Sequence, residues 1–79
     1  MRYFEKLRID FIDNFIFYFG YINRADIMNE FGISQPQASK DLRTYMEMNP
    51  DKIFYNVKAK RYEIKRSVER KNIKTAKTI

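Results

Sequence analysis

The chain has 79 residues, a net charge of +6 and no cysteine or histidine. The lack of cysteine excludes disulfides and thiolate metal sites, and the lack of histidine removes the commonest metal ligand and the commonest general base. A chain of this length fits one small domain. Because no paired carboxylates and no nucleophile with a base stand out, we expect no enzyme activity, no metal, no cofactor and no small-molecule ligand.

The positive charge is concentrated in one part of the chain. Residues 1–51 carry six Lys or Arg against eight Asp or Glu, whereas residues 52–79 carry ten against two. Such an asymmetry favours a nucleic acid or another anionic surface as the partner of the C-terminal part. The alternative is a basic tail that serves solubility only.

Membrane insertion and export are not indicated. The longest uninterrupted apolar run, residues 15–19, is far below the roughly 18 residues that a membrane span needs. The N-terminus mixes acidic and basic residues and does not resemble a signal peptide. We therefore expect a soluble, cytoplasmic protein that does not contact membranes.

Residues 4–19 predict a first helix with two apolar faces. One set has the spacing of a buried helical stripe: Phe4, Leu7, Phe11, Phe15 and Tyr18. A second set lies on the adjoining flank: Ile9, Ile12, Ile16 and Phe19. Together they cover roughly 200° of the helix, about twice what one core face needs. Either short neighbouring segments cover the second face, or a second copy does. We predict a homodimer with Ile9, Ile12, Ile16 and Phe19 at its interface.

Two glycines divide the next segment. Gly20 ends the first helix and Tyr21–Ile22 predict a brief strand. Asn23 is a suitable N-cap for a helix over residues 24–31, which Gly32 then ends.

The third predicted helix begins at Ser34 and fades near residue 48. Ser34 is an N-cap, Pro36 lies in the first turn, and Gln37 is placed to complete a capping box. Ala38, Leu42 and Tyr45 form a narrow apolar stripe. The other side carries donors suited to base edges and phosphates, and we predict DNA contacts at Ser34, Gln35, Gln37, Ser39, Lys40 and Arg43. The alternative is an ordinary surface helix whose polar side faces water.

After Pro50 the apolar period changes to two, which predicts a β-hairpin from residues 53–57 and 61–64. A hairpin directly after a helix-turn-helix is a wing. Lys58, Lys60 and Arg61 at its tip are expected on phosphates or in a minor groove. The predicted fold is mainly α (α+β), a three-helix winged helix-turn-helix in residues 1–66, followed by a basic tail or linker in residues 67–79.

Several of these residues carry a resemblance to a known family. The run FGISQPQASKDL at Phe31–Leu42, INRAD at Ile22–Asp26, Tyr45, Pro50, and the wing residues Tyr55, Lys60 and Tyr62 resemble the N-terminal winged helix-turn-helix of WYL-domain transcriptional regulators. The resemblance covers about residues 7 to 64. It implies double-stranded DNA as partner, binding as a homodimer, and the Ser34–Arg43 helix in the major groove. Members of this type include repressors of bacterial anti-phage defence operons.

The sequence also departs from that family. Full-length members continue into a WYL domain, which nothing after Ile64 resembles, so ligand sensing is not carried over. The alternatives are an excised DNA-binding domain and a small protein that keeps only this module. The favoured hypothesis is a sequence-specific transcriptional repressor that reads an inverted repeat. The rival hypothesis is a winged-helix module for protein–protein contacts, including a small mimic that pairs with a host regulator.

Overall fold

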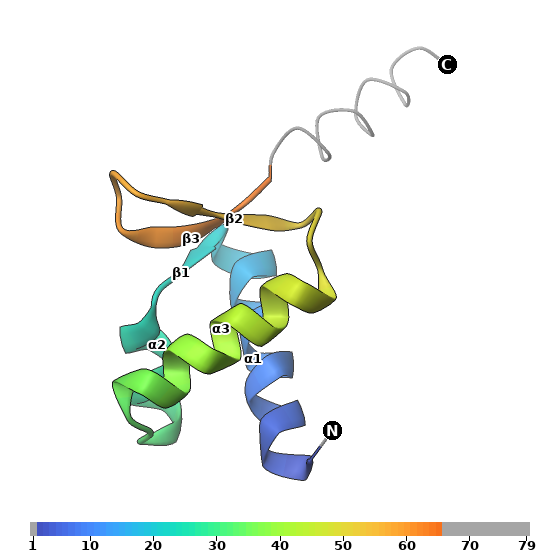
Figure 1. Cartoon of the computed structure of the whole chain (residues 1–79), viewed down its shortest axis with the longest axis vertical. Helices are drawn as coiled ribbons and strands as arrows, with labels where there is room; N and C mark the ends of the chain where they lie inside the picture. Colours follow the sequence, from blue (N-terminus) through green and yellow to red (C-terminus); the bar gives the residue numbers. More distant parts are fainter. Residues whose placement is uncertain (1, 66–79) are drawn as a thin grey trace.

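The computed structural model describes residues 2–65, which fold into three helices and a small sheet. Figure 1 shows α1 (Tyr3–Phe19), α2 (Arg24–Phe31) and α3 (Gln35–Met48) on one side of β1 (Tyr21–Ile22), β2 (Ile53–Asn56) and β3 (Arg61–Ile64). The winged helix-turn-helix predicted from sequence is confirmed, with element ends within one residue or so of those expected. The predicted tail, 67–79, lies outside the described residues, as does residue 66.

The wing hairpin is extended to three strands by the short segment after α1. The strand order is β1-β3-β2, with both neighbouring pairs antiparallel. Tyr55 lies opposite Tyr62, and Tyr21 lies opposite Glu63. Because alternate residues of a strand point to opposite faces, the side chains of Tyr55 and Tyr62 share one face of the sheet and those of Tyr21 and Glu63 share the other.

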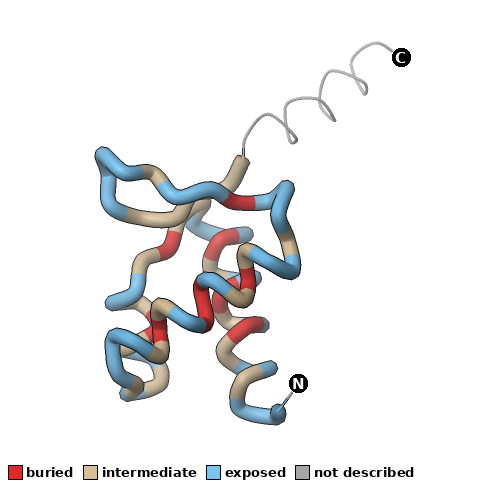
Figure 2. Tube along the Cα trace, viewed as in Figure 1, coloured by how far each residue is buried: buried red, intermediate tan, exposed pale blue. Residues whose placement is uncertain are grey.

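One hydrophobic core lies between the helices and the sheet (Figure 2). All three helices and both outer strands contribute to it. Its buried members are Ile9, Ile12, Ile16, Ile22, Ile27, Ala38, Leu42, Tyr45 and Ile53. Ala38 and Leu42 are fully buried, as the apolar stripe of the third predicted helix requires.

The two apolar faces of α1 have the opposite roles to those predicted. Ile9, Ile12 and Ile16 are 6%, 0% and 2% exposed and belong to the chain's own core, so they are not available as a dimer interface. Their compact side chains fit in one cluster with Ala38 and Leu42 of α3, where large aromatic rings would overpack the crossing. Phe19, the fourth residue predicted at the interface, is exposed.

The stripe predicted to be buried is instead largely open. Phe4 is 70% exposed, Tyr18 is 77% exposed and Leu7 is 39% exposed. Phe11 and Phe15 are half-buried and pack on Phe31 and Tyr21, with ring centroids 5.4 and 6.3 Å apart. We call these five residues, Phe4, Leu7, Phe11, Phe15 and Tyr18, the α1 aromatic stripe. In the described part of the chain, no helix is long and apolar enough to cross a membrane.

Candidate nucleic-acid interface

Local signals at both ends of the turn between α2 and α3 set the direction of α3. Gly32 ends α2 at φ 65°, a left-handed conformation that favours glycine, and its N–H donates to the Met28 carbonyl at 2.8 Å. Ser34 then caps α3, and its Oγ accepts the Gln37 N–H at 3.3 Å. Pro36 lies in the first turn, where an N–H is not needed. The second helix of the helix-turn-helix is therefore fixed at its start.

The predicted capping box is only half formed. The Gln37 side chain does not return to Ser34 but turns forward, and its Nε2 donates to Asp41 Oδ1 at 3.0 Å. A complete box is present one helix earlier, where Asn23 Oδ1 accepts the Asp26 N–H and Asp26 Oδ2 accepts the Asn23 N–H. The acidic Asp26 also lies near the positive end of α2, which stabilises that short helix.

Burial divides α3 into a core face and an open face. Ala38, Asp41, Leu42 and Tyr45 are buried. Of the predicted DNA contacts on α3 and its cap, Ser34, Gln35, Lys40 and Arg43 are exposed, whereas Gln37 and Ser39 are half-buried on its flanks. Lys40 and Arg43 therefore project from a face that no described segment covers. They are the two exposed cations of this face of α3.

Asp41 is the one charged residue in the core of residues 2–65, and it was not among the predicted site residues. It is 1% exposed, and its carboxylate accepts from Arg8 Nε at 2.6 Å and Arg8 Nη2 at 3.4 Å. With the Gln37 bond, donors of two residues on different helices meet this carboxylate. Because a carboxylate only accepts, the Gln37 amide must direct its nitrogen inward, which leaves Oε1 as its acceptor toward solvent.

A second polar contact joins α3 to α1. The Tyr45 hydroxyl donates to Asp13 Oδ1 at 2.5 Å, while its ring is buried in the core. Burial first, and then the hydrogen bond to Asp13 and the charge of that carboxylate, raise the pKa of Tyr45 well above its usual value. Together with Arg8 and Asp41, this contact fixes α3 on α1 at two positions along its length.

The three cations predicted at the wing tip are separated by the fold. Lys58 and Lys60 lie in the turn between β2 and β3, which Asn56 shapes by accepting the Ala59 N–H at 3.0 Å. Arg61 is held elsewhere: its Nε lies 2.7 Å from Glu63 Oε2 and its guanidinium lies 4.3 Å from the centroid of the Tyr21 ring. It therefore belongs to the sheet face opposite Tyr55 and Tyr62, not with the two wing lysines.

Arg24, which was not predicted as a contact, lies beside α3. Its Nη1 donates to Ser39 Oγ at 3.4 Å, so the first residue of α2 borders the flank of α3. Among residues 2–65, no group of three or more acidic side chains is arranged to hold a metal ion. Around Arg24 and the open face of α3, the described side chains supply mainly cations and hydrogen-bond donors.

Comparison with known proteins agrees with this geometry. The sequence model of the BrxR transcriptional regulator winged helix-turn-helix domain matches residues 5–77. A DNA-binding transcriptional repressor CapW from Stenotrophomonas maltophilia is 40% identical over 62 residues, which are 78% of this chain and 21% of that protein. The repressors of the same name from Escherichia coli and Pseudomonas aeruginosa are 39% and 36% identical over 61 residues, 77% of this chain and 20% of theirs. The chain thus spans about a fifth of the curated relatives it matches.

Proposed function

The chain belongs to the family of BrxR transcriptional regulator winged helix-turn-helix domains, and from this we propose that it binds double-stranded DNA sequence-specifically as a transcriptional repressor. The observation that carries the proposal is the open face of α3, from which Lys40 and Arg43 project. The relatives named as DNA-binding repressors support it. Its proposed place of action is the cytoplasm.

In this proposal α3 enters the major groove, which is wide enough to admit a helix. Arg43 reads a base, since a guanidinium can donate two hydrogen bonds to one guanine. Lys40 acts on the phosphate backbone, and Ser34, Gln35 and Ser39 donate or accept at the groove edges. Gln37 has its nitrogen engaged by Asp41, so it reads a base amino group, that of adenine or cytosine, through Oε1.

The wing supplies the sequence-independent part of the affinity. Lys58 and Lys60 lie in its turn and contact phosphates or the minor groove next to the site that α3 reads. Arg61 is engaged by Glu63 and Tyr21 and contributes less than the two lysines. Phosphate contacts of this kind make affinity fall with salt concentration.

We further propose that the chain binds DNA as a homodimer through the α1 aromatic stripe, in place of the isoleucine face predicted from sequence. The stripe is spaced 3, 4, 4 and 3 residues apart, so its spacing reads the same in both directions about Phe11. In an antiparallel pair of α1 helices related by a two-fold axis, each copy presents the same patch, and this spacing lets every member of the stripe face another member. Phe4 of one copy then meets Tyr18 of the other, and the two Phe11 rings meet at the axis.

The exposed area of the stripe supports a modest interface. At about 200 Å² per aromatic side chain, Phe4 and Tyr18 at 70% and 77% exposure offer about 300 Å² per copy, hence about 600 Å² in a pair. Leu7 and the half-buried Phe11 and Phe15 add to this, toward the roughly 1,200 Å² of a small stable interface. The α1 residues in the core shared with α3 are the isoleucines and not the stripe, so a dimer through the stripe leaves the exposed face of α3 open and favours an inverted repeat.

Selection of bound sequences from a random duplex pool tests the DNA proposal. We expect one enriched motif, arranged as an inverted repeat. Arg43→Ala should then weaken binding to that motif by about 1–3 kcal/mol. Gln37→Ala should lower the affinity for the motif more than it lowers the affinity for random-sequence duplex. Enrichment of no motif, or an Arg43→Ala variant with unchanged affinity, would refute sequence reading by α3.

The dimer has its own test in a pair of glutamate variants. Tyr18→Glu should stay folded by circular dichroism but sediment as a monomer and bind the inverted repeat far more weakly. Ile16→Glu is the matched control, since its side chain is 2% exposed and a charge there should unfold the chain. A wild-type chain that is monomeric at tens of micromolar and binds a half-site as tightly as the repeat would rule the dimer out.

A second candidate function, a protein–protein module, is favoured by the same exposed rings. Besides the stripe, Phe17 and Phe19 are 76% and 59% exposed on the last turn of α1. A module of this kind, such as a mimic that pairs with a host regulator, would bind duplex DNA weakly and without sequence preference. It would instead form a heterodimer that Tyr18→Glu abolishes. The duplex selection therefore separates the two candidates directly.

A further inference from the structure

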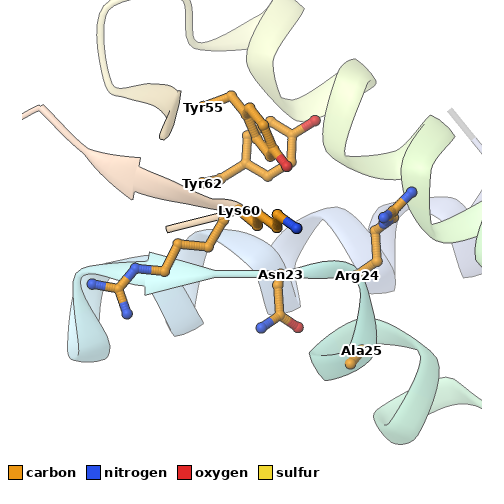
Figure 3. Close-up of a pocket in the computed structure, with 7 residues that line it drawn as sticks. Asn23, Arg24, Ala25, Tyr55, Lys60 and Tyr62 are labelled. Atoms are coloured by element: carbon orange, nitrogen blue, oxygen red, sulfur yellow. The ribbon is translucent and has the colours of Figure 1, made fainter. Parts of the chain in front are cut away.

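A small basic pocket lies between the start of α2 and the inner face of the wing (Figure 3). Its volume is about 230 Å³, less than the 300–1,000 Å³ of typical small-molecule sites. The lining comes from two segments far apart in sequence: Asn23, Arg24 and Ala25 on one side, and Tyr55, Lys60, Arg61 and Tyr62 on the other. Its size suits one small chemical group, not a whole metabolite.

The pocket is positively charged and holds no carboxylate. Arg24 and Lys60 both line it, and within residues 2–65 neither forms an ion pair. Arg24 has a single polar contact to Ser39 Oγ, at 3.4 Å, which leaves most of its five N–H donors free. Both side chains are exposed, so an anion that enters the space between them is attracted by two cations that have no other counter-charge among the described residues.

Neutral donors point into the same space. The rings of Tyr55 and Tyr62 pack edge to face with centroids 4.8 Å apart. Figure 3 shows the side chains of Tyr55, Tyr62 and Lys60 extending from the wing toward the side on which Arg24 lies. A phosphate accepts several charge-assisted bonds at once, so this combination of guanidinium, ammonium and phenol suits it well.

The backbone at Lys60 adds an independent observation. Lys60 has φ 56°, the one positive φ outside glycine among the described residues. Glycine or asparagine adopts this conformation with the least strain. A lysine held there is strained, and such an outlier points to a role for its side chain. The Lys60 residue held in this conformation is one that lines the pocket.

We propose that this pocket holds one phosphate of the DNA backbone, bound jointly by Arg24 and Lys60 with the tyrosine hydroxyls as further donors. The proposal rests on the DNA binding proposed above and deepens it. Arg24 also touches Ser39 on α3, so the seated phosphate lies next to the recognition helix. The pocket therefore sets the angle at which α3 and the wing engage the same strand.

The test is a set of charge-removing variants measured on random-sequence duplex over a range of salt concentrations. Arg24→Gln and Lys60→Gly should each lower affinity about tenfold. The double variant should flatten the log–log salt slope by about one unit in total, the value of about 0.9 for one phosphate. Lys60→Gly relieves the positive φ, so its melting temperature should equal or exceed that of the wild type.

Lys58→Gln is the matched control, because Lys58 lies in the same turn but does not line the pocket. The loss of DNA affinity in Lys58→Gln should add to the loss in Arg24→Gln. The losses in Arg24→Gln and Lys60→Gly should instead be less than additive when the two are combined, because both residues bind the same phosphate. The proposal would be overturned if Arg24→Gln and Lys60→Gly both kept the salt slope and the affinity of the wild type. It would also be overturned if the double variant flattened the salt slope by about two units, because the two residues would then bind separate phosphates. If wild-type protein binds no duplex at all, the function proposed above fails together with this pocket.

A calorimetric titration separates the DNA backbone from a free ligand. Inorganic phosphate should bind the wild type only weakly, with a Kd above about 1 mM, because a free phosphate lacks the other DNA contacts. Saturable binding of inorganic phosphate below about 1 mM, lost in the double variant, would assign the pocket to a free phosphate ligand and overturn the assignment to DNA.

Discussion

The buried pair of Arg8 and Asp41 predicts an unusual order of stabilities. Asp41 is 1% exposed and its main partner is Arg8 at 2.6 Å. Arg8→Met leaves the carboxylate buried with only the Gln37 amide, and breaking such a pair costs about 3–5 kcal/mol. A domain of 79 residues has about 4–12 kcal/mol to lose, so this single change should remove at least about a quarter of its stability.

Removing both charges should cost much less. In Arg8→Met with Asp41→Leu, no charge remains buried, and apolar replacements of a buried ion pair are often neutral or stabilising. The stability of Asp41→Leu alone should lie between the stabilities of Arg8→Met and of the double variant. The reason is that the Arg8 side chain is 15% exposed and can turn its guanidinium toward water. The double variant should therefore be more stable than Arg8→Met, although it carries one more substitution.

Urea unfolding followed by circular dichroism measures all four proteins of this cycle. The denaturant dependence should be similar among them, so that midpoints report stability. A loss below 1 kcal/mol in Arg8→Met, or a double variant less stable than both single ones, would refute the view that this pair fixes α3 on α1.

Three further predictions concern the same fold. Leu42→Ala, at a position with no exposed surface, should cost about 2–5 kcal/mol, and a thermal melt that shifts by only a degree or two would contradict this. The raised pKa of Tyr45 means that folding favours its neutral form, so stability should be full below pH 10 and fall as the pH rises past the usual tyrosine value of about 10; Tyr45→Phe should remove that part of the decline in a pH series of urea melts. Gly32→Ala should cost about 1–2 kcal/mol from its φ of 65° alone, since nothing lies within 4 Å of an added Cβ, and Gly32→Asn should cost measurably less.

The elements were predictable from sequence because their signals are local. Asn23 and Ser34 cap the helices that follow them, and Gly32 ends α2. The change of period after Pro50 marks the start of the wing. Each of these signals acts within one turn of chain, so no knowledge of the packing was needed to read it.

The faces were harder to predict because they depend on contacts between distant segments. Both apolar sets of α1 have helical spacing, and only the crossing of α3 decides that Ile12 is buried and Tyr18 is not. Arg61 was grouped with Lys58 and Lys60 by proximity in sequence, whereas strand alternation and the nearby Tyr21 and Glu63 hold it on the other face. Asp41 gave no signal of burial, since its partner Arg8 lies on another helix.

The order of strands has a consequence for how the domain assembles. β3 is the last strand in the chain and the middle strand of the sheet, and β1 and β2 pair with it and not with each other. Until β3 is in place, neither β1 nor β2 has a strand to pair with, so the three strands should form the sheet as one cooperative unit. Closing β1 onto β3 joins two distant parts of the chain, a step that costs more entropy than forming the hairpin. That closure also brings the wing back to the end of α1, where the Ile64 N–H donates to the Gly20 carbonyl at 3.0 Å, so the position of the wing depends on the pairing of β1 with β3.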